Sequence, residues 1–280
     1  MRSLDSLMKS SPKLPAPIPS SSSTVIPDSF SLCGNTALIT GSSSGIGHAI
    51  ADAIEDSGAQ VIRHGIETTP PDTDAGKPYI CENLLSDDGP EQLIEACFAQ
   101  HPGLDLLVCN AGDCHNAPFL EMTRDRWDRT IDLNLKANYF AAQAFAKKLH
   151  AENRSGAIVI TGSVNGFQTE INSSAYDISK GGCAMMVKGL ATELADLNIR
   201  VNGIAPGLIF TPKTRPGFAR NPGKQSHYEN KILQGHIGEA EDCAGAVVFL
   251  LSQAAAYITG EMIVIDGGLT VGQIGKMPTT

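Results

Sequence analysis

Three residues have side chains whose types and spacing suit proton transfer. Tyr176 and Lys180 are four residues apart, so on a helix both side chains lie on one face. A free phenol has a pKa of about 10 and is a poor acid or base at neutral pH, but a neighbouring ammonium stabilises its charged form. We therefore expect Lys180 to activate Tyr176. Ser163 precedes this pair and could donate a hydrogen bond to a carbonyl oxygen.

Each of these residues also has an ordinary structural interpretation. A tyrosine and a lysine at this spacing occur by coincidence on exposed helix faces, and a serine after Thr-Gly is typical of a turn or a helix N-cap. Asn134 alone would count as a polar residue in a mixed helix. The combination of the Tyr-Lys pair with Ser163 favours chemistry over these alternatives.

A glycine-rich turn predicts a second function, the binding of phosphate groups. Residues 40–47 read TGSSSGIG, directly follow an apolar run and open a helical pattern. Glycines let the backbone approach a pyrophosphate, and the start of a helix offers unpaired N–H groups and a positive dipole end. Alone, this turn would also fit an ordinary loop. Between a strand and a helix it predicts a dinucleotide site formed by Gly41, Ser43, Ser44, Gly45, Ile46 and Gly47.

The chain around these residues alternates short apolar runs with longer helical patterns, which is typical of βαβ units. We expect seven strands at Thr36–Thr40, Gln60–Arg63, Pro78–Cys81, Leu104–Cys109, Ala157–Thr161, Arg200–Ile204 and Met262–Ile265. Helices are expected at Gly47–Ser57, Pro90–Gln100, Arg124–His150, Ala175–Asp196 and Glu239–Leu251. The predicted fold is α/β, a single doubly wound Rossmann-like domain with a seven-stranded, mostly parallel sheet.

Composition excludes several classes of function. The net charge of -9 and the scattered basic residues argue against a nucleic-acid groove or an anionic membrane surface as partner. No apolar run is long enough to span a bilayer. Seven cysteines without a CxxC pair favour reduced thiols in the cytoplasm. A metal site is not expected, because the turn at residues 110–112 accounts better for the nearest candidates, Cys109, Cys114 and His115.

The N-terminal 30 residues differ from the rest of the chain. They contain five prolines and four consecutive serines, a composition that does not form a core by itself. We expect a flexible tail over 1–30 and the catalytic domain over 31–280. The segment has no apolar centre, which argues against a secretory signal, and its two aspartates disfavour an organelle transit peptide.

The motifs together resemble the short-chain dehydrogenase/reductase family. Its phosphate turn reads TGxxxGxG, its YxxxK pair corresponds to Tyr176 and Lys180, and Asp266-Gly267-Gly268 is similar to its last strand ending. Cys109-Asn110-Ala111-Gly112 is similar to its NNAG turn and departs from it at Cys109. The resemblance implies catalytic roles for Asn134, Ser163, Tyr176 and Lys180. It implies further cofactor contacts from Asn110, Ala111, Gly112, Tyr176, Lys180, Pro206, Gly207 and Thr211.

In this family the asparagine bends its helix and holds a water that relays protons to the lysine, and the lysine also binds the nicotinamide ribose. The resemblance therefore implies an enzyme that transfers hydride between NAD or NADP and a small alcohol or ketone. Members are commonly dimers or tetramers packed through their long helices, so a homodimer or homotetramer is expected.

The choice between NAD and NADP depends on the end of the second strand. An acid there binds both ribose hydroxyls and excludes a 2′-phosphate, but this chain has Gly65. NADP-dependent members of the family carry a basic residue at one of two positions, which are Ser44 and Ile66 in this chain. Arg63 could meet a phosphate and Glu67 could serve a ribose, so the sequence favours NAD only slightly. Further contacts are expected from Arg63, and from Asn83 or Glu82 at the adenine ring.

The predicted specificity loops, 164–174 and 208–238, are polar. Their residues could recognise a sugar, sugar acid or polyol, although loop polarity also follows from solvent exposure; the candidates are Gln168, Glu170, Asn172, Lys213 and Arg215. An alternative function is a cofactor-binding regulatory or redox-sensing protein on the same fold. The presence of all four residues implied for catalysis, Asn134, Ser163, Tyr176 and Lys180, argues against such a sensor, which needs no proton transfer. A nucleotide-sugar epimerase or dehydratase shares YxxxK but fits the turn spacing and the chain length less well.

Overall fold

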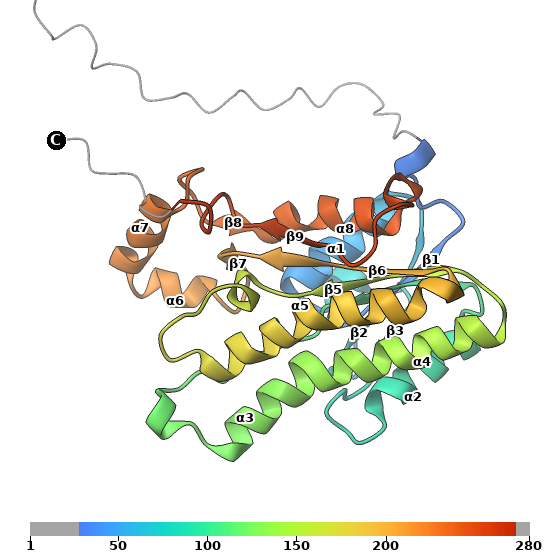
Figure 1. Ribbon diagram of the computed structural model, residues 1–280, viewed down its shortest axis with the longest axis horizontal. Helices are drawn as coiled ribbons and strands as arrows, with labels where there is room; N and C mark the ends of the chain where they lie inside the picture. The colour runs from blue at the N-terminus through green and yellow to red at the C-terminus, as the bar shows by residue number, and fades with distance from the viewer. Residues whose placement is uncertain (1–27, 273–280) are drawn as a thin grey trace, which may run out of the picture.

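The computed structural model describes residues 28–272 and contains one seven-stranded sheet (Figure 1). The strand order is β3-β2-β1-β4-β5-β6-β9, and every neighbouring pair is parallel. The strands are β1 (Thr36–Ile39), β2 (Gln60–Gly65), β3 (Tyr79–Cys81), β4 (Leu104–Cys109), β5 (Gly156–Thr161), β6 (Ile199–Pro206) and β9 (Met262–Ile265). This order confirms the predicted doubly wound α/β fold.

Helices cover both faces of the sheet, which explains why the strands are apolar on both sides. One face carries α1 (Gly45–Asp56) and α8 (Ala244–Leu251), whose buried residues share a core with Val61 and Val108. The other face carries α2 (Gly89–Gln100), α4 (Ala137–Ala151) and α5 (Ser174–Leu194), which pack against Ile62 and Leu107. Figure 1 shows these two layers above and below the strands.

The predicted helix Arg124–His150 is divided in the structure. It begins as α3 (Arg124–Ile131), whose N-cap Thr123 accepts a hydrogen bond from the backbone N–H of Arg126 at 3.3 Å. A π-helical turn follows over Asp132–Lys136, and α4 continues from Ala137. Asn134 lies inside the π-turn. Such turns are rare and frequently mark functional sites.

The segment after β6 forms a small unit that periodicity did not predict. It contains β7 (Ile209–Phe210), α6 (Arg215–Ala219), α7 (Pro222–Lys231) and β8 (Gly238–Glu239). Phe218, Ile232 and Ile237 form its own small core, with Tyr228 packed against them. In Figure 1 this unit lies at one end of the sheet, beyond the carboxyl ends of the strands.

Short 3₁₀ turns complete the described chain: η2 (Asp28–Phe30), η3 (Asp72–Asp74), η4 (Phe119–Glu121), η6 (Val164–Gly166), η7 (Ala195–Leu197), η8 (Ala240–Cys243) and η9 (Gln253–Ala255). The ring of Phe30 lies 5.9 Å from that of Phe249, so contacts with the body begin at the edge of the segment predicted to be a tail. Residues 1–27 lie outside the described part. Among residues 28–272, no helix has both the length and the apolar character needed to cross a bilayer.

Candidate active site

Three of the predicted site segments lie at the carboxyl ends of β1, β4 and β5. β1 pairs with β2 on one side and with β4 on the other, so the chain changes direction across the sheet at the β1–β4 boundary. Ligands of open α/β sheets bind in the crevice at such a switch point. The glycine turn follows β1, the Asn110-Ala111-Gly112 turn follows β4, and Ser163 follows β5.

The glycine turn has a backbone that side chains would obstruct. Gly41 and Gly45 have φ angles of +62° and +59°, in the left-handed region that favours glycine. A β carbon at Gly47 would overlap the amide nitrogen of Asn110 and the carbonyl of Gly41. The turn is therefore compact, with Ser43 half-buried and Ser44 exposed at its rim. Ile46 is partly buried and packs against the core below α1, so its side chain anchors the turn.

The N-terminus of α1 fits a phosphate group. Its N-cap residue Ser44 makes no side-chain hydrogen bond to the helix start, whereas Thr123 caps α3. Backbone N–H groups of the first turn of this 12-residue helix are thus left for an anion, and the helix dipole adds positive potential. A β carbon at Gly45 would lie 3.4 Å from Thr211, which places that residue beside the turn.

Two side chains that the site prediction omitted support this turn. Thr40 Oγ1 accepts hydrogen bonds from the N–H groups of Asn110 and Ala111 at 2.9 and 3.0 Å, and Asn110 Nδ2 donates to the carbonyls of Thr40 and Gly41. His64 Nδ1 accepts from the N–H of Gly41 at 3.0 Å, and its Nε2 lies 3.1 Å from the carbonyl of Glu82. Burial lowers the pKa of His64. A neutral imidazole protonated at Nε2 satisfies both contacts.

Tyr176 and Lys180 lie on α5, one turn apart, as their spacing predicted. Lys180 is buried, and its Nζ donates to the carbonyl of Thr161 at 2.9 Å. The same Nζ lies 5.7 Å from the centre of the Tyr176 ring. A β carbon built on Gly112 would be 3.7 Å from Nζ, so the turn after β4 passes directly beside the ammonium. The lysine therefore connects the ends of β4 and β5 with the phenol.

Asn134 is buried next to this lysine and fixes the backbone of Asp113. Its Oδ1 accepts from the N–H of Asp113, and its Nδ2 donates to the carbonyl of the same residue, both at 2.8 Å. Nδ2 also lies 3.0 Å from Ser179 Oγ. The main-chain carbonyl of Asn134, in the π-turn, accepts from Asn138 Nδ2 at 2.7 Å and lies 3.2 Å from Cys183 Sγ. The π-turn thus aims the side chain of Asn134 at the loop beside Lys180.

Ser163 has the capping role that the sequence left open as its structural interpretation. Its Oγ accepts from the N–H of Asn165 at 3.2 Å and so caps η6. The hydroxyl also lies 3.5 Å from the carbonyl of Pro206, a long contact that its proton can leave for a better acceptor. Asp177 fixes the following loop by accepting from Asn165 Nδ2 at 2.7 Å and from the N–H of Glu170 at 3.0 Å.

The predicted cofactor contact of Arg63 requires correction. Its side chain is fully buried on the α1 side of β2, where it pairs with Asp52 at 2.7 Å, Glu55 at 3.0 Å and Asp74 at 3.2 Å. Residues alternate between the two faces of a strand, so Arg63 follows Val61 towards α1. Because three carboxylates surround the guanidinium, it is not offered to a cofactor phosphate.

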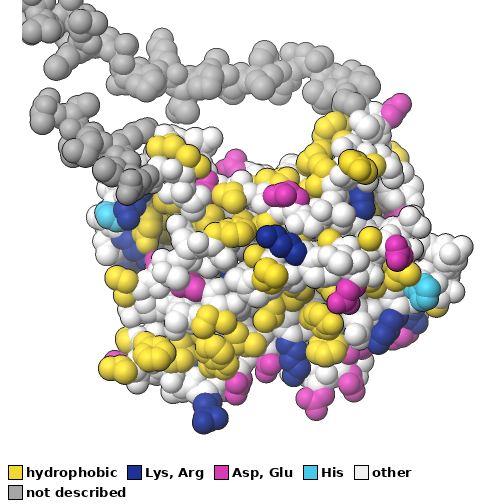
Figure 2. All heavy atoms as spheres, viewed as in Figure 1, with side chains coloured by type: hydrophobic (Ala, Val, Ile, Leu, Met, Phe, Trp, Pro, Cys, Tyr) yellow, Lys and Arg dark blue, Asp and Glu magenta, His cyan; other side chains and the backbone are white. Residues whose placement is uncertain are grey.

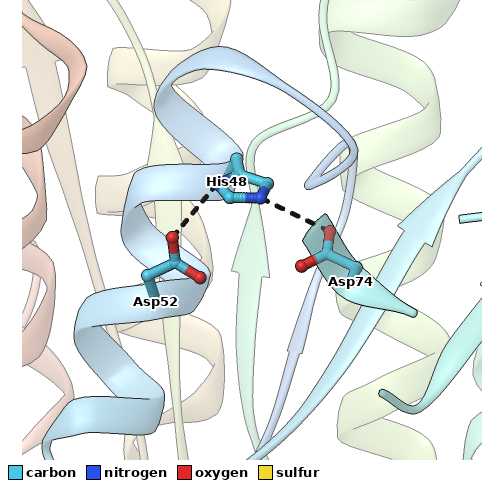
Figure 3. A group of neighbouring side chains, drawn as sticks. All are labelled: His48, Asp52 and Asp74. Carbon is cyan, nitrogen blue, oxygen red and sulfur yellow. Dashed lines mark ion pairs between the residues drawn. The ribbon is translucent and has the colours of Figure 1, made fainter. Parts of the chain in front are cut away.

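His48, Asp52 and Asp74 are close enough together to resemble a metal site (Figure 3). The imidazole of His48 lies between the two carboxylates, 3.1 Å from Asp52 and 3.4 Å from Asp74. Arg63 and Lys77 also contact these carboxylates, so cationic side chains already balance the negative charge. We interpret the group as an ion-pair network that attaches η3 to α1 and β2.

Three further predicted contacts have packing roles in the structure. The Asn83 side chain accepts from the N–H of Leu85 at 3.1 Å and shapes the turn after β3. Gly207 lies against Asp266, where a β carbon would be 2.9 Å from the Asp266 Cα. Pro206 ends β6 beside Ser163. Gly207 and Pro206 thus line the same edge of the sheet as the glycine turn.

Loops on the open side of the site are joined by polar contacts. Lys213 forms an ion pair with Asp113, Glu170 accepts from the hydroxyl of Tyr228 at 2.9 Å, and the N–H of Ala117 donates to the carbonyl of Asn172. Arg215 pairs with Glu239 at 2.6 Å and stacks on Phe210. Gln168 is exposed. The segments after β4, β5 and β6 therefore contact one another.

Comparisons with known proteins match most of the chain. The family model described as enoyl-(acyl carrier protein) reductase covers residues 41–270. A 2-dehydro-3-deoxy-D-gluconate 5-dehydrogenase of Pseudoalteromonas atlantica is 34% identical over 252 residues, which are 86% of this chain and 98% of that protein. A short-chain type dehydrogenase/reductase from Mycobacterium marinum is 32% identical, with a TM-score of 0.81 over 88% of this chain and 99% of the other.

A third relative carries ligands in its crystal structure. It is a gluconate 5-dehydrogenase from Burkholderia cenocepacia in complex with NADP and tartrate, 28% identical to this chain. Its TM-score is 0.83, over 88% of this chain and 98% of that chain. The similarity thus extends over whole chains, and not only over the glycine turn.

Proposed function

This chain belongs to the short-chain dehydrogenase/reductase family, and from that premise we propose that it oxidises or reduces a sugar acid or polyol at a secondary carbon. The class of reaction comes with the family: an NAD(P)-dependent oxidoreductase that interconverts a secondary alcohol and a ketone. The observation that carries the proposal is the convergence of Tyr176, Lys180 and Asn134 beside loops rich in charged and amide side chains.

The residues present fit a nicotinamide dinucleotide. The glycine turn and the uncapped start of α1 would bind its phosphates, and Thr211 and Gly112 lie where the rest of the molecule must pass between turn and lysine. A bound nicotinamide ring would supply or accept the hydride. We assign Lys180 to its ribose because the ammonium is already positioned between Thr161 and Gly112.

The proton is the part of the reaction that this chain supplies itself. We assign the phenol of Tyr176 as the group that gives a proton to the substrate oxygen in reduction and takes it in oxidation. Ser163 donates to the same oxygen once its hydroxyl leaves the long contact with Pro206. Asn134 is assigned to the position of Lys180 and to its proton supply. A regulatory protein would not require these groups, which argues against that alternative.

Tyr176→Phe tests the assignment because it removes only the hydroxyl. We expect unchanged cofactor binding and loss of most turnover, measured as nicotinamide absorbance with hydride transfer as the observed step. Ser163→Ala serves as the second variant and should lower kcat less. Near wild-type turnover in Tyr176→Phe would refute the proposed proton transfer.

The substrate class is tested with sugar acids, neutral polyols and simple ketones in both reaction directions. Lys213 reaches the loop after β4 through its ion pair with Asp113. We propose that a substrate carboxylate competes with Asp113 for this ammonium. Lys213→Met should then lower kcat/KM for sugar acids and leave neutral polyols nearly unchanged. Equal losses for both substrate groups would argue against carboxylate recognition by Lys213.

We also propose that the protein is a homodimer or homotetramer in the cytoplasm. The surface of α4 and α5 contains a hollow of about 370 Å³ lined mainly by apolar side chains, Tyr139 and Met186 among them. Ile178 and Met185 are exposed on α5, and Figure 2 shows hydrophobic side chains gathered on the face formed by these helices. Met185→Glu should weaken assembly in light-scattering measurements. The spacing of the seven cysteines, which includes no CxxC pair, supports the proposed compartment.

We further propose that the enzyme prefers NAD to NADP. Arg63 is unavailable to a 2′-phosphate, and Ser44 and Ile66 carry no charge. The Burkholderia cenocepacia relative binds NADP, so the comparisons do not favour this choice. Binding constants for both dinucleotides test it directly, and tighter binding of NADP by the wild type would contradict it.

A further inference from the structure

A carboxylate lies at the end of β2, although the last residue of the strand is a glycine. The carboxylate comes from Glu67, two residues further along the chain. Gly65 is the last residue of this strand, and a β carbon built on it would lie 2.5 Å from Oε2 of Glu67. The same β carbon would lie 3.1 Å from Cβ of Ser43 in the glycine turn. It would also overlap the Tyr79 hydroxyl, so the Glu67 carboxylate and this hydroxyl together fill the space that a side chain at position 65 would otherwise enter.

Tyr79 fixes the Glu67 carboxylate in this position. Tyr79 lies on β3 and is paired in register with Arg63 of β2. Its hydroxyl donates to the main-chain carbonyl of Glu67 at 3.0 Å and lies 3.4 Å from Oε2. Burial and the charge of Glu67 raise the pKa of Tyr79 to about 12, so the hydroxyl keeps its proton at neutral pH. The tyrosine remains a donor, which favours the charged form of its partner.

The charges around this carboxylate make the local potential negative. Glu82 follows β3, and its backbone N–H donates to the carbonyl of Gly65 at 3.1 Å. His64 Nδ1 accepts a hydrogen bond from the N–H of Gly41, so this nitrogen carries no proton and the ring is neutral. In the described part of the chain, the cations beside β2 are Arg63 and Lys77, and both are bound by the carboxylates of the network that includes Asp52 and Asp74 (Figure 3).

This arrangement of charges should affect the binding of NAD and NADP differently. The adenosine ribose of a dinucleotide lies at the end of the second strand in this fold class. A free 2′-hydroxyl there could donate to Glu67, as it would to an acid at position 65. A 2′-phosphate would bring about two negative charges close to the same carboxylate. The difference arises from side chains and not from the course of the backbone, so a shared fold does not predict it.

We propose that Glu67 is a specificity-determining residue, whose carboxylate, positioned by Tyr79, binds the adenosine ribose in place of an acid at position 65 and disfavours a 2′-phosphate. The inference rests on the proposed function, because it requires that the crevice binds a nicotinamide dinucleotide. It assigns the selectivity to a residue two positions beyond the one that the dinucleotide fingerprint specifies.

Equilibrium binding of NAD⁺ and NADP⁺ to the full-length protein tests the proposal without any substrate. Glu67→Gln removes the charge and keeps the size, and it should weaken NAD⁺ binding about tenfold through loss of a charged hydrogen bond. NADP⁺ should bind more tightly to Glu67→Gln than to the wild type. Tyr79→Phe should change the ratio of the two dissociation constants in the same direction and by less. Asp72→Asn, an equal charge change at an exposed position of the same β2–β3 connection, should leave the ratio unchanged.

The ionic strength provides a second readout. Discrimination against NADP⁺ by the wild type should weaken as salt screens Glu67, and this dependence should be smaller in Glu67→Gln. If the ratio of the two dissociation constants in Glu67→Gln is within about twofold of the wild-type ratio, the inference is wrong. That result would leave the proposed cofactor site unchallenged. Failure of the wild type to bind either dinucleotide would refute the proposed function and the inference together. Melting curves of the variants show whether each is folded.

Discussion

Replacing Arg63 by methionine should destabilise the protein strongly, although the two side chains are similar in volume. The guanidinium is fully buried between α1 and β2 and pairs with Asp52, Glu55 and Asp74. Asp74 is fully buried as well, so it cannot turn towards water when its partner is lost. Methionine fills most of the space but leaves this carboxylate without its closest cation.

The expected cost follows from the burial of each partner. Removing one member of a buried pair typically costs 3–5 kcal/mol, because the remaining charge is left uncompensated. Asp52 and Glu55 are 45% and 41% exposed, so their pairs with Arg63 add at most about 1 kcal/mol. His48 and Lys77 stay within 4 Å of Asp74 and reduce the loss. We therefore expect about 3 kcal/mol for Arg63→Met.

Urea unfolding followed by circular dichroism measures this cost as a lower midpoint at unchanged slope. Asp74→Asn in the same background should restore part of the stability, because the double variant no longer buries a lone charge. Arg124→Met, at an exposed position of α3, is the matched control and should change stability by less than about 0.5 kcal/mol. If Arg63→Met costs no more than this control, or if it selectively weakens NADP⁺ binding, the structural role assigned to Arg63 is wrong.

Three other perturbations have defined outcomes. Lys180→Ala should weaken cofactor binding and move the pH optimum of turnover upward, and an unchanged pH–rate profile would show that Lys180 does not assist Tyr176. Burial lowers the folded-state pKa of His64 below 6.5, so its contribution to stability is complete above pH 6.5 and is lost as pH falls towards that lower value. His64→Asn should therefore flatten the loss of stability on acidification, measured by urea unfolding between pH 5 and 7, and an equal slope in both proteins would exclude His64 as the titrating group. Removing residues 1–27 leaves the Phe30–Phe249 contact in place and should not change melting temperature or turnover; a loss of either would contradict the dispensable tail.

The strands and the switch point were predictable because they depend on local patterns. All seven strands form where apolar runs occur between turn residues, and the glycine turn takes the strand-turn-helix position that its sequence indicated. Tyr176 and Lys180 meet because residues four apart on a helix always share a face. The role of Arg63 was within reach of the same reasoning. Strand alternation places it with Val61, and α1 carries Asp52 and Glu55 on the facing side.

Other features depend on contacts that no local pattern records. The π-turn at Asn134 interrupts a segment whose periodicity predicts one helix. There the side chains of Asn138 and Cys183 donate to the Asn134 carbonyl, and Cys183 comes from another helix. Helices α6 and α7 have little apolar periodicity. Their signals were the prolines at their first turns and the N-cap Asn221, which accepts from Lys224.

The loop 110–113 directly contacts residues assigned to each of the three proposed functions of the site. At its start, Asn110 donates to the carbonyls of the glycine turn and so fixes the phosphate-binding backbone. Gly112 passes beside the ammonium of Lys180. Asp113 is bound through its backbone by Asn134 and through its carboxylate by Lys213 of the loop after β6. We therefore expect a displacement of this loop to affect the proposed phosphate-binding, proton-transfer and substrate-binding groups together. The proposed selectivity for the adenosine ribose is separate, because the hydrogen bonds between Glu67, which follows β2, and Tyr79 on β3 do not involve this loop. The geometry thus allows cofactor preference to change without altering the positions at which the proton is transferred.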